Sequence, residues 1–508
     1  MATTIGSALK WWARTKPEHV ALVLGAETLT YRQLQDWSGR LARVLSASGI
    51  APGERVGLLA PNCLQWPVIA LALLKCGAIL VPLNPRFTAA EIHKTAYDSG
   101  FGAVIAAPSL RDVALEAAGD SGDFTVLGFD VVDAERTGDA DDFAVDTDVA
   151  DPIAVIYTSG TTGMSKGITL TNRTMLDIVL ENSLTEEGFR PGAVSLLVLP
   201  LAFTPGLVFG LLMTTVLGGT LIVEPGLDAV RAVDLLEKHR VQTIFGVPLI
   251  FQAMSAAPTF AGADLSSLRT AIVGGAAVPA ELLTAWADKG VLLRQIYGMT
   301  EAGGVATATL RSEALEHPGS CGSGSIFTEV RVLSAEGGFA GPGETGEIVV
   351  RGPGVTPGYW NDPDTTATAI RDGWLHSGDL GVADADGRIT FVDRLKDLII
   401  SGGINISPVE LEAAILGVDG VAEVAVIPAP DPRFGETPAA VVVPGPGRDD
   451  VDELAVIGHC ERVLADYKIP RYVVIRSAPL PRLPSGKIAK RLVRDEYRDV
   501  AERFARAR

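Results

Sequence analysis

Residues 153–167 read IAVIYTSGTTGMSKG, an apolar run of strand length that leads directly into a loop of Gly, Thr and Ser. Glycine has no Cβ atom, so several backbone N–H groups of such a loop can approach one anion, and the hydroxyl groups add further donors. Lys166 adds a mobile positive charge for outer phosphates. The segment is not a Walker A loop, because Lys166 follows Ser165 and precedes Gly167. It predicts a phosphate-binding loop, with a flexible surface loop as the less favoured alternative.

Strand-length apolar runs alternate with helix-period segments on both sides of this loop. Such alternation predicts a mostly parallel sheet that helices cover on both faces. The expected strands are 56–60, 78–82, 195–199, 220–223, 243–245, 270–273 and 292–296, and the expected helices include 65–76, 230–239 and 279–287.

The pattern changes towards the C-terminus. Short β signals at 346–351 and 388–392 predict a small β-rich part, and mixed short elements follow Arg394. The predicted fold class is therefore α/β, with a large N-terminal domain over residues 1–395 and a small, mobile α+β domain over residues 396–508. In the small domain, helices are expected near 408–415 and 453–464, and strands at 421–427 and 439–443.

Composition excludes several classes of function. The 508 residues carry 43 Lys+Arg and 61 Asp+Glu, a net charge of −18, which disfavours non-specific binding to nucleic acid or anionic membranes. The longest apolar run, residues 68–83, contains Lys75 and is too short for a bilayer, so no integral membrane association is expected. The 4 cysteines show no metal-type spacing, which predicts reduced thiols in a cytoplasmic protein. Residues 130–151 are strongly acidic and predict a solvated linker or loop.

The segment YTSGTTGMSKG at 157–167 resembles the phosphate-binding signature of the adenylate-forming enzymes, which include acyl-CoA synthetases. Later segments match the same family in its order: YGMTE at 297–301, SGDL at 377–380, DRLKD at 393–397 with SGGIN at 401–405, and LPSGK at 483–487. Because these segments are spread over most of the chain, the sequence is identified as a member of the adenylate-forming (ANL) superfamily, of the acyl-CoA synthetase (fatty-acid–CoA ligase) type.

The resemblance implies a site for ATP and Mg²⁺. Tyr297 would stack on the purine, and Asp379 and Arg394 would contact the ribose. Glu301 and Thr162 would hold Mg²⁺ on the phosphates. The implied nucleotide-binding residues are Thr158, Ser159, Gly160, Thr161, Thr162, Gly163, Lys166, Gly275, Ala276, Tyr297, Gly298, Thr300, Asp379, Arg394 and Lys487, and the implied catalytic residues are Lys487, Glu301, Thr300 and Lys166.

The resemblance also implies two half-reactions. A carboxylate attacks the α-phosphorus of MgATP to give an acyl-adenylate and pyrophosphate, while Lys487 offsets the repulsion between the two anions. The small domain then rotates at the hinge, Lys396, and brings Ser401, Gly402 and Gly403 to the site for attack by CoA. The chain ends soon after the lysine motif without a carrier segment, which favours free CoA as the acceptor. Lys490 and Arg491 are interpreted as surface charges.

The expected acyl pocket is apolar, with Phe203, Phe245 and Gly274 as its candidate residues. Phe203 stands where the family often carries His, and a phenyl ring cannot hydrogen-bond to a carboxylate. An apolar pocket predicts a hydrophobic acid. A medium- or long-chain fatty acid is favoured, and an aryl or alicyclic acid is the alternative. A catalytically silent binding protein of the same fold is a further alternative, which the joint presence of the motif residues disfavours. A homodimer is compatible with the sequence.

Overall fold

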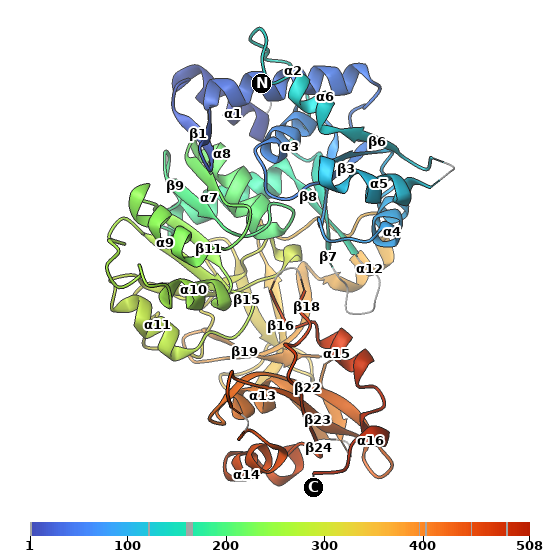
Figure 1. Ribbon diagram of the computed structural model, residues 1–508, viewed down its shortest axis with the longest axis vertical. Coiled ribbons are helices and arrows are strands. Elements are labelled where there is room, and N and C mark those ends of the chain that lie inside the picture. Colours follow the sequence, from blue (N-terminus) through green and yellow to red (C-terminus); the bar gives the residue numbers. More distant parts are fainter. Residues whose placement is uncertain are drawn as a thin grey trace. The chain divides into compact units, whose positions relative to one another are not determined.

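The computed structural model describes residues 3–119, 122–158, 166–395, 397–401, 404–448, 450–483 and 486–507. The chain divides into two compact units (Figure 1). The first comprises Met1–Val330 and Val350–His376, and the second comprises Arg331–Val349 and Ser377–Arg508. Lys396 lies outside the described residues, so a domain boundary at this residue stays a prediction.

The first unit contains an eight-stranded sheet with the strand order β14-β13-β12-β11-β9-β10-β1-β2. Its inner strands are all parallel, and only β2 and β14 at the two edges run antiparallel to their neighbours. The carboxyl ends of β11, β12 and β13 therefore lie at one edge, which is where open α/β sheets bind ligands. The strands are β1 (Val20–Leu24), β2 (Glu27–Thr30), β9 (Val194–Leu197), β10 (Thr220–Val223), β11 (Thr243–Gly246), β12 (Thr270–Gly274), β13 (Leu293–Tyr297) and β14 (Thr307–Ala308).

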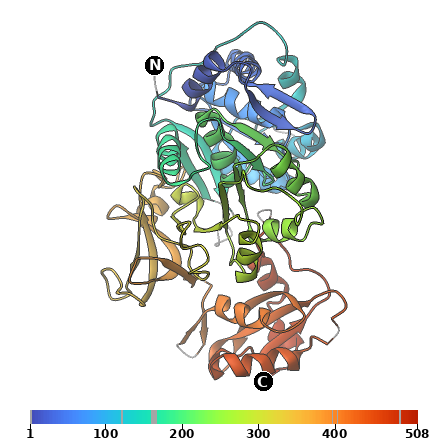
Figure 2. The same ribbon diagram turned by 90° about the vertical axis from the view of Figure 1, so that its left-hand side faces the viewer.

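A six-stranded sheet, in the order β6-β5-β3-β4-β7-β8, completes the first unit's parallel architecture. Only its last pair, β7 with β8, is antiparallel. Helices α1, α2 and α3 lie side by side in both ribbon views (Figures 1 and 2). The strands are β3 (Arg55–Leu59), β4 (Ile79–Leu83), β5 (Ala103–Ala106), β6 (Thr125–Gly128), β7 (Pro152–Thr158) and β8 (Lys166–Thr171).

The helices between these strands have the apolar faces that the sequence pattern predicts, and the α/β fold class is confirmed. Strand and helix bounds differ from the expected ones by one or two residues at most positions. The helices are α1 (Ile5–Thr15), α2 (Tyr31–Ala47), α3 (Gln65–Lys75), α4 (Ala89–Ser99), α5 (Arg111–Ala118), α6 (Phe129–Ala134), α7 (Asn172–Thr185), α8 (Met213–Leu217), α9 (Ala229–Lys238), α10 (Pro248–Ser255) and α11 (Ala280–Ala287).

The predicted β-rich part is a five-stranded sheet in the order β15-β16-β18-β17, with β19 paired to β18. Its strands are β15 (Glu329–Leu333), β16 (Thr345–Arg351), β17 (Ile370–Arg371), β18 (Trp374–Ala383) and β19 (Ile389–Arg394), with helix α12 (Pro363–Ala369) before β17. The antiparallel pairing of β18 with β19 places Asp379 opposite Arg394. Two residues that the sequence separates by a turn thus become neighbours.

The end of the second unit is a layered α+β fold around a sheet in the order β21-β20-β23-β22, with β24 on β23. Residues alternate between its faces: Val424 and Val426 pack with α13 and α14, whereas Ala425 and Ile427 pack with α15 and α16. The elements are β20 (Ile399–Ser401), β21 (Ile404–Ile406), α13 (Pro408–Leu416), β22 (Val421–Asp431), β23 (Gly435–Pro444), α14 (Glu453–Val463), β24 (Tyr472–Ile475), α15 (Lys490–Glu496) and α16 (Val500–Arg503).

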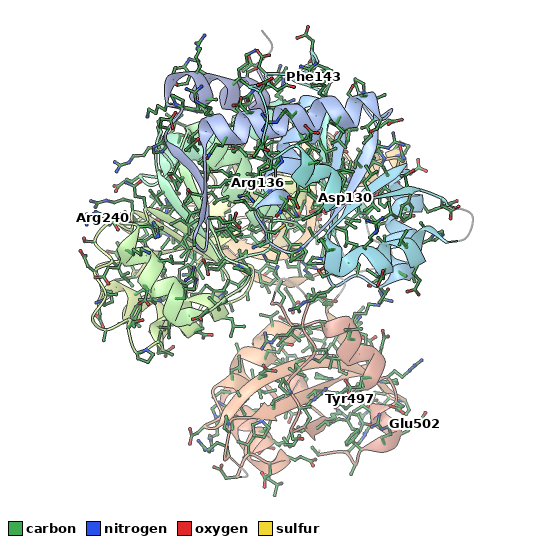
Figure 3. All side chains as sticks on the ribbon, turned by 45° about the horizontal axis from the view of Figure 1, so that its top comes forward. Asp130, Arg136, Phe143, Arg240, Tyr497 and Glu502 are labelled. Carbon is green, nitrogen blue, oxygen red and sulfur yellow. The ribbon has the colours of Figure 1, made fainter. Side chains whose placement is uncertain are left out.

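The acidic segment 130–151 is mostly exposed, as predicted for a solvated linker or loop, and it is also hydrogen-bonded to α2. It begins within α6, and the Arg40 guanidinium donates to the carbonyl oxygens of its next residues, among them Glu135 at 2.9 Å. Arg43 pairs with Asp141 at 2.8 Å and lies over the ring of Phe143. Figure 3 labels Asp130, Arg136 and Phe143 of this segment. In the parts of the chain that the structure describes, no helix has both the length and the apolarity needed to cross a membrane.

A buried lysine lies beneath this segment. Lys75 of α3 is only 3% exposed, and its ammonium donates to the carbonyl oxygen of Gln35 at 2.7 Å. Burial lowers the pKa of Lys75 from 10.5 to about 7, although Asp36, Asp141 and Asp142 act in the opposite direction. The unfolded chain therefore binds a proton at this residue over a pH range in which the folded chain does not.

We expect this difference to make folding stability depend on pH. Between pH 7 and 10.5 the unfolded state binds more protons at Lys75, so the free energy of unfolding rises with pH, by about 2 kcal/mol from pH 7.5 to pH 9. Lys75→Met should remove this contribution, as measured by urea unfolding at several pH values. Lys238→Met, at an exposed lysine, is the control. Parallel pH profiles for wild type and Lys75→Met would contradict the expectation.

Candidate functional site

The two ends of the predicted phosphate loop are held together by a β-hairpin. Strands β7 and β8 pair antiparallel, and their last partners are Thr158 and Lys166. Both residues are partly buried. The predicted loop residues Ser159, Gly160, Thr161, Thr162 and Gly163 lie outside the described residues. Lys166 is the first residue of β8, and its ammonium lies 5.1 Å from the centre of the Tyr359 ring.

Thr300 and Glu301 lie on a short 3₁₀ turn, Thr300–Ala302, just after β13. The Thr300 hydroxyl is 2.8 Å from the Thr204 hydroxyl. The Tyr359 hydroxyl donates to Glu301 Oε1 at 3.1 Å. Burial raises the pKa of Tyr359, and the negative charge of Glu301 raises it further. The phenol is therefore a donor to this carboxylate over the ordinary pH range.

Gly298 permits the close turn between β13 and these two residues. A Cβ atom at this position would lie 2.1 Å from the carbonyl oxygen of Gly304, which is far inside van der Waals contact. Only glycine fits here without moving the backbone, and this explains the small residue between Tyr297 and Thr300 in physical terms.

The predicted adenine-side residues lie at the ends of two neighbouring strands. Gly274 ends β12 and pairs with Ile296 of β13, which is followed by Tyr297. Gly274 and Tyr297 are buried, whereas Gly275 and Ala276 are exposed just beyond the strand. Because β12 and β13 are parallel and in register, Gly275, Ala276 and Tyr297 lie at the same edge of the sheet, as expected for residues of one site. Stacking of Tyr297 on a purine stays a prediction.

An aromatic pair lies beside this edge. Phe245, at the end of β11, stacks on Phe209 with ring centres 5.2 Å apart and an angle of 23°. Phe209 belongs to a buried π-helix, η2 (Pro205–Leu212), and a Cβ atom at Gly304 would lie 2.8 Å from its ring. π-Helical turns often occur at functional sites. The sequence marked the surrounding apolar run but could not single out Phe209, because every neighbour is also apolar.

A small cavity adjoins the Thr204–Thr300 hydroxyl pair. Its volume is about 10 Å³, enough for about one water molecule, and Val208 of the π-helix and Gly303 line it with these threonines. Phe203, the other candidate for the acyl pocket, is half-buried on the segment that precedes the π-helix.

Three residues that the resemblance assigns to the nucleotide lie together within the second unit. The Arg394 guanidinium is 3.2 Å from the Asp379 carboxylate, whose side chain is 8% exposed. Lys487 is half-buried and interacts electrostatically with both Arg394 and Asp379. Burial lowers the pKa of Lys487, Arg394 lowers it further, and Asp379 raises it.

The loop that bears Lys487 is held at both ends. The Leu483 N–H donates to the Lys487 carbonyl oxygen at 2.7 Å, and Arg482 forms an ion pair with Glu423 at 2.6 Å. Lys490 forms an ion pair with Glu412 at 2.8 Å, in which both side chains are mostly buried. The interpretation of Lys490 as a plain surface charge is therefore wrong, because it pairs with a carboxylate of α13. Arg491 is exposed, as expected.

The predicted hinge and CoA turn are only partly described. Lys396, Gly402 and Gly403 lie outside the described residues, and Ser401 pairs with Ile404 in the β20–β21 hairpin. A residue that the sequence analysis left without a role, Asp393, is buried and accepts hydrogen bonds from Ser407 Oγ at 2.5 Å and the Val409 N–H at 3.2 Å. It links the end of β19 to the start of α13. Its place in the DRLKD motif was the available signal.

Glu301 fits the ligand chemistry of Mg²⁺. A carboxylate is the hard oxygen ligand that Mg²⁺ prefers, and this one uses Oε1 to accept from Tyr359. The second predicted ligand, Thr162, is outside the described residues.

Known proteins resemble the chain over nearly its whole length. The pattern of the family described as "AMP-binding enzyme" matches residues 9–360, and that of the "AMP-binding enzyme C-terminal domain" matches residues 410–487. A feruloyl-CoA synthase of an Amycolatopsis species is 41% identical, with 96% of this chain and 97% of the relative covered. The long-chain-fatty-acid–CoA ligase FadD13 of Mycobacterium tuberculosis is 38% identical, with 92% and 93% covered.

Solved structures agree with this assignment. The ATP-bound crystal structure of MatB from Rhodopseudomonas palustris has a TM-score of 0.89 and 31% identity, and covers 98% of this chain and 100% of that one. The family uses ATP, Mg²⁺ and CoA, as the resemblance implied. The chain therefore belongs to the AMP-binding enzyme family and is an AMP-forming acyl-CoA ligase of the adenylate-forming superfamily.

Proposed function

We propose that the protein joins a hydrophobic monocarboxylic acid to CoA through an acyl-adenylate. The observation that carries the proposal is the meeting of polar and apolar groups at one sheet edge of the first unit. Thr300 and Glu301 follow β13 there, while the stacked rings of Phe209 and Phe245 lie beside Gly304 and β11. A site in which Thr300 and Glu301 lie next to two phenyl rings suits a substrate that has a carboxylate at one end and an apolar remainder.

In the first half-reaction, the substrate carboxylate attacks the α-phosphorus of ATP, and the bond to pyrophosphate breaks. Glu301 and Thr162 would hold Mg²⁺, which would neutralise charge on the phosphates when bound. Thr300 donates to an α-phosphate oxygen, and Lys166 offsets charge on the outer phosphates. Lys487 offsets the charge that develops between carboxylate and phosphate. Asp379 and Arg394 hold the ribose, and Tyr297 with Gly275 and Ala276 holds the base.

In the second half-reaction, the CoA thiolate attacks the acyl carbonyl carbon, and AMP leaves with the electron pair of the broken C–O bond. We propose that the small domain, residues 396–508, begins at Lys396 and rotates about this residue. The rotation would move Lys487 away from the adenylate and bring Ser401, Gly402 and Gly403 towards it. The pairing of Ser401 with Ile404 at the end of the β20–β21 pair supports this role for Ser401. One domain thereby serves two chemical steps.

Within hydrophobic acids, the geometry favours a flat aryl-bearing acid. The stacked Phe209–Phe245 pair forms an aromatic wall, and the partly exposed ring of Phe245 is the one against which a flat substrate ring can pack. The similarity to a feruloyl-CoA synthase supports this choice. A medium- or long-chain fatty acid is the second candidate, which the wholly apolar side chains of this region and the similarity to FadD13 support.

A thioester screen tests the proposal. Purified protein is given ATP, Mg²⁺ and CoA with phenylpropenoic acids, straight-chain acids of increasing length, an alicyclic acid, acetate and malonate, and AMP and thioester are quantified. We expect kcat/KM to be highest for a phenylpropenoic acid and lowest for malonate, whose second charge would be buried against phenyl rings. A maximum at a long straight chain would replace the aryl acid by the fatty acid. No AMP with any acid would overturn the proposed activity.

A further inference from the structure

Tyr359 connects the groups on both sides of the proposed phosphate site. Its hydroxyl donates to Glu301 Oε1 at 3.1 Å, and its ring lies under the Lys166 ammonium at 5.1 Å from the ring centre. These two partners come from segments 135 positions apart in the sequence, since one begins β8 and the other follows β13. None of the sequence motifs that mark the site includes Tyr359.

The backbone around Tyr359 is fixed to the same two segments. Tyr359 forms a β-bridge with Ile168, and the Trp360 N–H donates to the Gly167 carbonyl oxygen at 2.7 Å. On the other side, the Thr356 N–H donates to the carbonyl oxygen of Glu301 at 2.8 Å. The backbone of segment 356–360 therefore hydrogen-bonds to β8 and to the turn that contains Glu301. The Tyr359 side chain contacts the same two segments, through Lys166 and Glu301.

Further contacts hold this short segment in place. The Thr356 hydroxyl donates to the Thr169 carbonyl oxygen at 2.7 Å, and the Tyr359 N–H donates to the Thr366 hydroxyl at 2.9 Å. The Trp360 indole N–H donates to the Ser99 carbonyl oxygen at 3.1 Å. With its backbone anchored on several sides, Tyr359 has little freedom to follow Glu301 if that carboxylate rotates. Its hydroxyl can therefore hold the Glu301 carboxylate in one orientation.

We propose that Tyr359 is a positioning residue, which orients Glu301 towards the metal-bearing phosphates and holds the Lys166 ammonium beside them. The hydroxyl donates to Oε1, and no described residue forms a hydrogen bond or ion pair with Oε2 of Glu301, which can therefore bind a hard cation. The ring attracts the lysine cation through its quadrupole and restrains a long, flexible side chain. This inference rests on the proposed function, in which Glu301 holds Mg²⁺ and Lys166 faces the outer phosphates.

The two halves of the tyrosine can be tested separately. Tyr359→Phe removes the hydroxyl and keeps the ring, whereas Tyr359→Leu removes both. The readout is equilibrium binding by calorimetry of a non-hydrolysable ATP analogue, and of Mg²⁺ in the presence of that analogue. We expect Tyr359→Phe to weaken Mg²⁺ binding about tenfold, as expected for a lost hydrogen bond to a charged group, with metal-free analogue binding unchanged. Tyr359→Leu should weaken both.

Controls separate positioning from general stability. Tyr97→Phe, at a tyrosine that is 85% exposed on α4, should leave both affinities unchanged. In a Glu301→Gln background, Tyr359→Phe should have no further effect on Mg²⁺ binding, because the hydroxyl acts through the carboxylate. An Mg²⁺ affinity of Tyr359→Phe within twofold of wild type would overturn the inference, as would an undiminished effect in the Glu301→Gln background.

The same measurements distinguish this inference from the proposed activity. Binding of Mg²⁺ with the analogue needs no carboxylic acid. If wild type forms no AMP from any acid but Tyr359→Phe still weakens Mg²⁺ binding, the proposed activity fails and the positioning role stands. If wild type binds no Mg²⁺ with the analogue, both fail.

Discussion

Lys487→Ala is expected to lower the rate of acyl-adenylate formation by about 10²–10³-fold, the loss typical of removing one group that stabilises developing charge. Lys487 lies in the charge cluster of Asp379 and Arg394, and its carbonyl oxygen accepts a hydrogen bond from the Leu483 N–H. An alanine there leaves the attacking carboxylate and the α-phosphate without a cation between them. Pyrophosphate release in a single turnover measures this step.

The second half-reaction should be largely spared. Lys487→Ala given a synthetic acyl-adenylate and CoA should form thioester at nearly the wild-type rate, because the proposed rotation withdraws Lys487 before CoA attacks. Chromatography of the thioester measures this step. Arg491→Ala is the matched control, since Arg491 is exposed and only four residues away. Equal losses in the two half-reactions would contradict the withdrawal of Lys487.

Arg294→Met is expected to cost about 3–5 kcal/mol of the free energy of unfolding, because it leaves a buried carboxylate without its cation. Arg294 is the second residue of β13 and forms an ion pair with Glu186, which follows α7. The two residues are 8% and 6% exposed. Arg294 also donates to the Thr309 carbonyl oxygen at 2.6 Å. Urea unfolding of both proteins at pH 8 measures the loss.

The pH dependence and a double variant identify the cause. Burial already raises the pKa of Glu186, while Arg294 opposes this rise, so removal of Arg294 should raise the pKa further. A raised pKa means that stability falls as pH rises through it, and the loss in Arg294→Met should therefore be smaller at pH 5 than at pH 8. Glu186→Gln combined with Arg294→Met should recover much of the loss. A double variant as unstable as Arg294→Met would instead indicate a packing defect.

Both sequence patterns and motif matches predicted the fold of the first unit. Strands β10, β11 and β12 were expected almost to the residue, because each is a short buried run between turn residues, and burial on both faces leaves no polar positions inside it. For the acidic segment 130–151, the sequence predicted the exposure but not the contacts. Charge density indicates exposure, but it does not show that Arg40 and Arg43 of α2 will bind the segment's carbonyl and carboxylate oxygens.

For the candidate site, the sequence alone determined the family, the fold class and the residues to examine, because these depend on local patterns and on motifs in a set order. Only the tertiary structure decided which of them are neighbours. It placed Lys487 with Asp379 and Arg394, paired Lys490 with Glu412, stacked Phe209 on Phe245, and put Tyr359 between Lys166 and Glu301. These contacts join residues far apart along the chain, and the register and packing that create them leave no local signature in the sequence.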